Sequence, residues 1–158
     1  MRPLLSAALL AVVAGSPVLA LTCMPADPAR TFLRADADAA RYSALLGTLD
    51  FAPLDRPRAA FAPNAQEVTR SARFSGQALG ADGFAPTPDH TVHLDFSCAG
   101  DWCGTIDPGT RLLAFARHGA EGLEITIGPC DSWIFEDPDR AVIKTLETCM
   151  AGGPCAPD

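Results

Sequence analysis

Six cysteines, all of them after residue 20, constrain the fold of this chain more than any other feature of its sequence. They are Cys23, Cys98, Cys103, Cys130, Cys149 and Cys155. An even number of cysteines in an exported chain of this size indicates disulfides, although the count alone leaves their pairing open. The sequence therefore predicts folding in an oxidising compartment.

Residues 1–20 have the pattern of a secretory signal peptide. Arg2 supplies the positive charge, residues 4–13 form a mostly apolar run, and Val18-Leu19-Ala20 fits the cleavage rule at its first and last positions. We therefore expect one mature domain, residues 21–158. No stretch approaches the roughly 20 apolar residues of a membrane-spanning helix, so no membrane insertion is expected after signal removal.

The many arginines and alanines are typical of a GC-rich bacterial genome, which makes the expected location periplasmic or secreted. A competing interpretation takes Cys23 as a lipidated lipoprotein cysteine. Thr22 is a poor residue before such a cysteine, and lipidation would leave an odd number of thiols. The formal net charge of −7 disfavours nucleic acid as a partner.

The chain reads as two short helices around a series of short strands. Asp27-Pro28 is typical of a helix start, with Phe32 and Leu33 facing inward, and Asp137-Pro138 repeats that signal before an amphipathic helix. Strands are predicted at about 40–51, 68–79, 91–97, 112–116 and 123–127, with a bulge at Gly47, a turn at 80–88 and a polar loop at 98–104. The second helix presents Val142, Ile143, Leu146 and Cys149 on one face and stops at Gly152-Gly153.

Five strands without a repeating strand–helix–strand rhythm predict a mainly β fold. We expect a five-stranded OB-like Greek-key barrel with a short N-terminal helix and a C-terminal helix. A β-sandwich is the alternative, although it usually needs about seven strands.

The sequence offers no catalytic residue, metal ligand set or cofactor motif, so we expect a protein that is not an enzyme. His90 and His93 are three residues apart on a strand and should face opposite ways. Helix capping and solvation explain the acidic residues near the predicted helix ends, which are Asp36, Asp38, Asp137 and Asp139. A small extracellular hydrolase remains an alternative, because a carboxylate pair among them would be a possible catalytic site.

The two tryptophans each lie close to a cysteine. Trp102 lies between Cys98 and Cys103, and Trp133 follows Cys130 by three residues. Packing over disulfides is one interpretation of both. Contact with a protein partner is the other.

Two blocks of sequence resemble a known family, the tissue inhibitors of metalloproteinases. The first block runs from Thr22 to Asp36, with Cys23, Pro25, Pro28, Phe32 and Ala35-Asp36 at the family's spacings. The second comprises Cys103-Gly104, Pro108-Gly109, Leu112–Ala114, Gly122–Ile127 and Cys130-Asp131. The resemblance implies the netrin-like OB fold.

The family's disulfide pattern, transferred to these positions, implies that Cys23 pairs with Cys130. Leu21 stands where the family has its first cysteine, which leaves Cys103 to pair with Cys98. Cys149 and Cys155 then form the third bond.

The resemblance also implies a binding ridge at the mature N-terminus, formed by Leu21, Thr22, Cys23 and Met24. In the family, the terminal amine and carbonyl bind the zinc of a metalloprotease, and the next side chain enters its specificity pocket. Leu21 and Thr22 would take these places. Because Leu21 has no thiol, the expected function is a non-enzymatic protein-binding module, with inhibition of a zinc metalloprotease as the alternative.

Overall fold

The computed structural model describes residues 23–54, 66–130 and 133–157. The expected signal peptide and the first two ridge residues, Leu21 and Thr22, lie outside the described residues. The elements in chain order are α1 (Pro28–Ala37), β1 (Tyr42–Asp50), β2 (Val68–Gly80), β3 (Gly83–Phe96), β4 (Cys98–Ala99), β5 (Trp102–Cys103), β6 (Arg111–Gly119), β7 (Gly122–Ile127), β8 (Ile134–Glu136) and α2 (Arg140–Met150).

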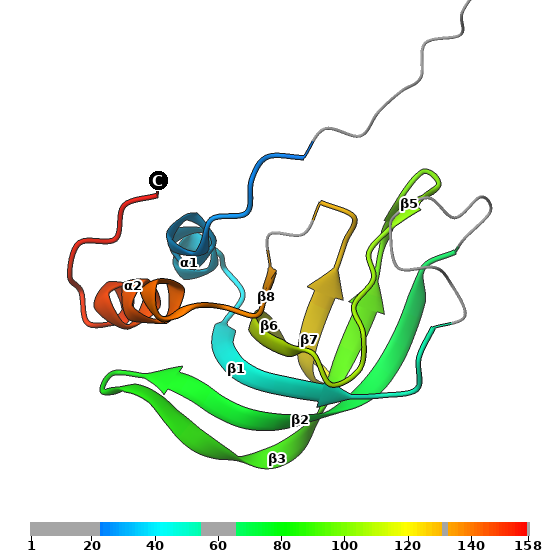
Figure 1. Cartoon of the computed structure of the whole chain (residues 1–158), viewed down its shortest axis with the longest axis horizontal. Helices are drawn as coiled ribbons and strands as arrows, with labels where there is room; N and C mark the ends of the chain where they lie inside the picture. The colour runs from blue at the N-terminus through cyan, green and yellow to red at the C-terminus, as the bar shows by residue number, and fades with distance from the viewer. Residues whose placement is uncertain (1–22, 55–65, 131–132, 158) are drawn as a thin grey trace, which may run out of the picture.

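Five of the strands close into a barrel (Figure 1). β1 pairs with β2, β2 with β3, and β7 with β6, all antiparallel. β6 then returns to β1, and the parallel pairing of β3 with β7 completes the ring. This is the predicted OB-like barrel, and the five expected strands form it. The sandwich alternative is excluded.

Two glycines let β1 and β2 cross at close range. Gly47 pairs with Gly76, and a Cβ on either would lie within 2.3 Å of a carbonyl oxygen of the other strand. The register of β2 against β3 shifts between Phe74 and Gly76. The irregularity expected at Gly47 therefore lies in the partner strand, opposite that glycine. Such a bulge increases twist and helps a sheet to close.

The interior of the barrel is apolar. Its fully buried side chains come from all five strands of the barrel and include Leu45, Leu49, Phe74, Val92, Leu94, Phe96, Leu112, Ile125 and Ile127. Alternation along a strand explains this, because residues two apart share a face. The barrel interior is thus a single hydrophobic core.

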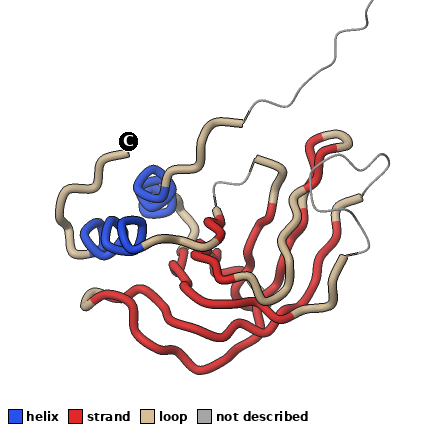
Figure 2. The backbone as a smooth tube through the Cα atoms, in the orientation of Figure 1, coloured by secondary structure: helices blue, strands red, loops and turns tan. Residues whose placement is uncertain are grey.

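A second apolar layer lies between the barrel and the helices, which stand side by side on one side of it (Figure 2). The opposite faces of β1 and β6 supply Ala44, Leu46, Leu113 and Phe115, and α2 supplies Leu146. Half-buried Phe32, Tyr42, Trp133 and Phe135 pack against them. We call this second cluster the outer layer.

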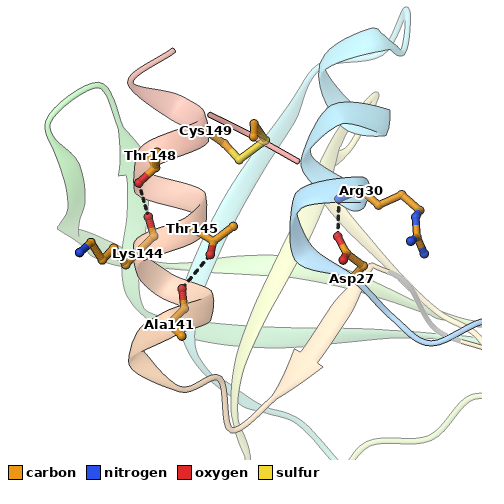
Figure 3. Close-up of a disulfide and its surroundings, with 8 residues drawn as sticks. Asp27, Arg30, Ala141, Lys144, Thr145, Thr148 and Cys149 are labelled. Carbon is orange, nitrogen blue, oxygen red and sulfur yellow. Dashed lines mark hydrogen bonds between the residues drawn. A yellow bond between two sulfur atoms is a disulfide. The ribbon is translucent and has the colours of Figure 1, made fainter. Parts of the chain in front are cut away.

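Helix α1 begins as the sequence indicates. Asp27 caps it by accepting a hydrogen bond of 2.6 Å from the Arg30 amide, and Pro28 is the first helical residue (Figure 3). Phe32 joins the outer layer, as expected. The expectation for Leu33 is wrong, since it is 41% exposed. Successive helical residues point about 100° apart, so both cannot face the narrow contact with the barrel.

Helix α2 begins two residues later than predicted. Its cap is Asp139, which accepts a 2.9 Å hydrogen bond from the Val142 amide. Asp137 and Pro138 are instead tied to β6, because the Asp137 amide donates to the Arg111 carbonyl and Arg111 Nη1 donates to the Pro138 carbonyl. The predicted buried face is confirmed, with Leu146 and Cys149 buried and Val142 and Ile143 half-buried.

Strand β3 is longer than expected, and the turn predicted at 80–88 is wrong. The turn occupies only Ala81 and Asp82, and the strand then runs through Pro86 and Pro88. β7 pairs with β3 only from Val92 onward. The preceding part of β3 therefore has a free edge, where proline's missing N–H costs no ladder hydrogen bond.

Three short strands were not anticipated. The expected polar loop at 98–104 contains a small hairpin of β4 and β5 around Gly100, whose φ is +62°. β8 pairs with residues 112–114 of β6, beside the stretch that β7 occupies. Segments of two or three residues are too short to show alternation in a sequence.

The structure contains the three disulfides that the resemblance implies. Cys23 bonds to Cys130, Cys98 to Cys103, and Cys149 to Cys155. The last of these ties the tail after α2 back to the helix (Figure 3), where Thr145 and Thr148 donate to the carbonyls of Ala141 and Lys144. Three disulfides indicate an extracellular or otherwise oxidising compartment. Neither described helix is long and apolar enough to cross a membrane.

Candidate binding ridge

The described half of the expected ridge is fixed to the barrel by one covalent bond. Cys23 is five residues before α1, and its bond to Cys130 joins Cα atoms 5.2 Å apart across a sequence separation of 107. Cys130 follows β7, the strand that closes the barrel. The chain end is therefore attached to the rigid part of the fold, while both cysteines stay exposed.

Met24 is the most exposed large hydrophobic side chain among the described residues, at 76%. It stands between the disulfide and Pro25. Proline restricts the backbone of the residue before it to extended conformations, so Met24 has few alternatives open to it. An exposed apolar side chain on a restrained backbone is suited to contact with a partner.

A basic groove of about 440 Å³ lies between this segment and α1. Cys23, Met24 and Pro25 line it from the chain end, and two cations, Arg30 and Arg34, line it with one anion, Asp27. The Arg30 side chain points away from its helix in Figure 3 and has no hydrogen bond or ion pair to any described residue. The groove therefore presents the positive charge of Arg30 on the surface of an acidic protein.

A second and larger groove, of about 710 Å³, reaches the same segment at Ala26. Thr105 and the end of β7 also line it. Three acidic residues also line it: Glu136, Asp137 and Asp139. The segment from Cys23 to Asp27 therefore contributes lining residues to both grooves.

Trp133 packs against one residue of α1 and one residue of β1. Its ring stacks on Tyr42 with centroids 4.9 Å apart, and the Arg34 guanidinium lies 3.8 Å from its centroid. Trp133 is half-buried in the outer layer, and Trp102 is half-buried in the β4–β5 hairpin next to Cys103. Packing therefore accounts for much of both rings, and a role in partner contact stays a prediction.

The histidines of β3 face opposite ways, as predicted. His90 packs on Phe74 with ring centroids 5.3 Å apart, and His93 lies on the other face. His90 is half-buried rather than exposed, and its Nδ1 lies 2.9 Å from the Pro88 carbonyl oxygen. In the part of the chain that the structure describes, no three His, Cys, Asp or Glu side chains are grouped to hold a metal ion.

A serine–histidine pair is not evident from the sequence, because its two residues are 75 positions apart. Ser43 Oγ lies 2.8 Å from His118 Nε2, and Arg41 Nη2 lies 3.2 Å from His118 Nδ1. Arginine can only donate, so Nδ1 accepts and Nε2 carries the proton. That tautomer donates to Ser43 instead of accepting its proton. The pair therefore lacks the orientation of a nucleophile with a general base.

Among the described residues, two groups show clearly shifted pKa values, and neither is part of the ridge. Burial, followed by the charge of Asp38 and a hydrogen bond to it, raises the pKa of Tyr42. Hydrogen bonds from Arg73 and then Ser75 lower the pKa of Asp89. Arg73 Nη2 lies 2.8 Å from Asp89 Oδ2 across β2 and β3. The shift of Tyr42 therefore has burial as its main cause, and that of Asp89 has a surface ion pair.

Comparisons with family models, curated proteins and solved structures found no match to the chain. The resemblance to the metalloproteinase inhibitors therefore stays a hypothesis based on the quoted residues.

Proposed function

We propose that the protein is a secreted or periplasmic, non-enzymatic binding module of netrin-like type. It contacts a protein partner through the ridge formed by Leu21, Thr22, Cys23 and Met24. The observation that supports this most strongly is the Cys23–Cys130 bond, which holds the exposed Met24 at the basic groove. A restrained chain end loses less conformational freedom on binding than a loose one.

A photo-crosslinking residue in place of Met24 tests this proposal in the exported protein. We expect a covalent adduct with a protein from the same compartment. The matched control places the same group at Asp82, which is exposed in the β2–β3 turn at a distance from the ridge elements. No adduct from position 24, or the same adduct from both positions, would contradict the proposal.

A zinc metalloprotease inhibitor is the second candidate, and the Cys23–Cys130 bond favours it because the family holds its inhibitory terminus by the equivalent bond. In this proposal the amine and carbonyl of Leu21 bind zinc, and Thr22 enters the specificity pocket. Adding one alanine before Leu21 should abolish inhibition, because the amine is displaced from the metal. An inhibition constant that stays the same after the addition rules this mechanism out.

A further inference from the structure

A separate cavity of about 340 Å³ lies at the other end of α1. It is bounded by the last turn of α1, the segment leading into β1, and Met150 at the end of α2. The basic groove at the ridge instead uses Arg30 and Arg34, and it shares no lining residue with the cavity. Its volume is within the roughly 300–1,000 Å³ range of small-molecule sites.

Aromatic side chains form much of its lining. Phe115 is buried in the outer layer, and Phe32 and Tyr42 are half-buried walls. Four alanines complete the apolar surface: Ala35, Ala39, Ala40 and Ala44. Small residues beside aromatic rings leave room for a compact apolar group.

Two of the three charged side chains that line the cavity are negative, and the third is Arg41. Asp36 and Asp38 line it, and Asp36 has no hydrogen bond or ion pair to any described residue. Asp38 receives the Tyr42 hydroxyl at 3.2 Å and the Ala40 amide at 2.9 Å, so its carboxylate is held in place.

The position of these aspartates runs against the ordinary electrostatics of a helix. The C-terminal end of a helix carries partial negative charge, which favours basic residues there. Here Asp36 shares the last turn of α1 with Arg34, and Asp38 is its C-cap. The Arg34 guanidinium lies over Trp133, and Arg41, which also lines the cavity, faces His118. The partial negative charge of the helix end therefore adds to the charges of the two aspartates.

We propose that this cavity binds an alkylated ammonium group, with Asp36 and Asp38 facing its charge and Phe32, Tyr42 and Phe115 contacting its methyl groups. A cation bearing methyl groups suits aromatic carbon better than a primary ammonium, which is more strongly hydrated. The site is independent of the ridge and of the function proposed for it.

Titration of the full mature protein with choline, monitored by amide chemical shifts, tests the proposal. We expect saturable shifts confined to residues 35–44 and Met150. Two matched probes separate the two parts of the interaction. The neutral isostere 3,3-dimethylbutan-1-ol removes the charge, and ethanolamine removes the methyl groups. Each should bind more weakly by roughly threefold to thirtyfold. Equal binding of either probe, or shifts that do not saturate, would overturn the proposal.

Variants of the chain locate the site. Asp36→Asn should weaken choline binding severalfold, because it removes an exposed charge with no structural partner. Glu121→Gln is the matched control, since it changes an exposed carboxylate in the β6–β7 turn that does not line the cavity and should leave binding unchanged. Tyr42→Leu should also weaken binding, and the Asp36 result stands without it if that variant does not fold. Unchanged affinity in Asp36→Asn refutes the placement.

The ammonium group has two possible sources, a free small molecule or a lipid headgroup. Sedimentation with phosphatidylcholine vesicles, and with phosphatidylglycerol vesicles as control, distinguishes them. Choline binding with phosphatidylcholine-specific sedimentation supports the headgroup, and choline binding without it supports a soluble ligand. Absence of both contradicts the proposal.

Discussion

The interior of the barrel and the outer layer are built in part from the same strands, and they differ in how much of their side chains stays exposed to solvent. β1 and β6 send Leu45, Leu49 and Leu112 inward, where none is more than 1% exposed. Their opposite faces carry the outer layer, whose aromatic residues other than Phe115 stay half-buried, and one of them, Trp133, lies against a charged side chain. The closed ring of paired strands surrounds the barrel interior, whereas α1 and α2 cover the outer layer.

This difference separates stability from recognition. A closed ring leaves no edge within the barrel and fixes the positions at which other segments attach. The ridge, both grooves and the 340 Å³ cavity all involve the helical side or the ends of strands. We therefore expect substitutions in the barrel to affect folding most, and substitutions outside it to affect smaller and more local free energies.

The largest effect is expected from Phe74→Ala in the barrel. Phe74 is completely buried and covers the crossing of Gly47 and Gly76. Its truncation leaves a cavity and should lower the free energy of unfolding by about 3–5 kcal/mol. Phe32→Ala in the half-buried outer layer is the matched comparison and should cost less. Denaturant unfolding measures both, and an equal or larger loss for Phe32→Ala would invalidate the contrast.

Removing the Cys23–Cys130 bond should have the next largest effect. The double variant Cys23→Ser/Cys130→Ser frees a loop of 107 residues in sequence separation, and we expect a loss of about 2–4 kcal/mol. The loop closed by Cys149 and Cys155 has a separation of 6, so Cys149→Ser/Cys155→Ser should cost less through loop entropy. Thermal unfolding of both variants compares them, and the reverse order would refute the loop-length explanation.

The sequence predicted the barrel because its strands show clear local alternation of apolar and polar residues. Alternation at Val92, Leu94 and Phe96 depends on burial of one face, and a closed barrel satisfies that pattern along every strand. The disulfide pairing followed from a resemblance, since the cysteine count alone leaves it open. Gly47 indicated a bulge that lies one strand away, because a single strand does not reveal what its partner does.

The parts of the site that were missed depend on contacts between distant residues. Ser43 and His118 meet only because β1 pairs with β6. The cavity needs the end of α1 and the end of α2 to come together, although its aspartates were recognised as residues near a helix end. The start of α2 was misplaced because Asp137 and Asp139 offer the same capping signal, and only the tie to Arg111 decides between them.

The two aspartates before α2 allow a smaller effect to be measured against a control. Asp139→Ala removes the side chain that caps the helix and should cost about 1 kcal/mol. Asp137 has a φ of +45°, a conformation that glycine adopts without strain, so Asp137→Gly should leave stability nearly unchanged. Unfolding free energies of the two variants decide which residue caps the helix. A larger loss from Asp137→Gly would restore the start predicted from sequence.

The smallest effect is expected from the surface pair of Arg73 and Asp89, at the free-edged part of the β2–β3 hairpin. Because the folded-state pKa of Asp89 is lowered, its contribution is present above the unfolded pKa and is lost as pH falls through the folded value. Stability should therefore decline on acidification slightly more in the parent protein than in Asp89→Asn. Both charges are exposed to solvent, so added salt should reduce the difference. A pH series of unfolding midpoints at low and high salt checks this, and a difference that grows with added salt would show that the pair does not act through its charges.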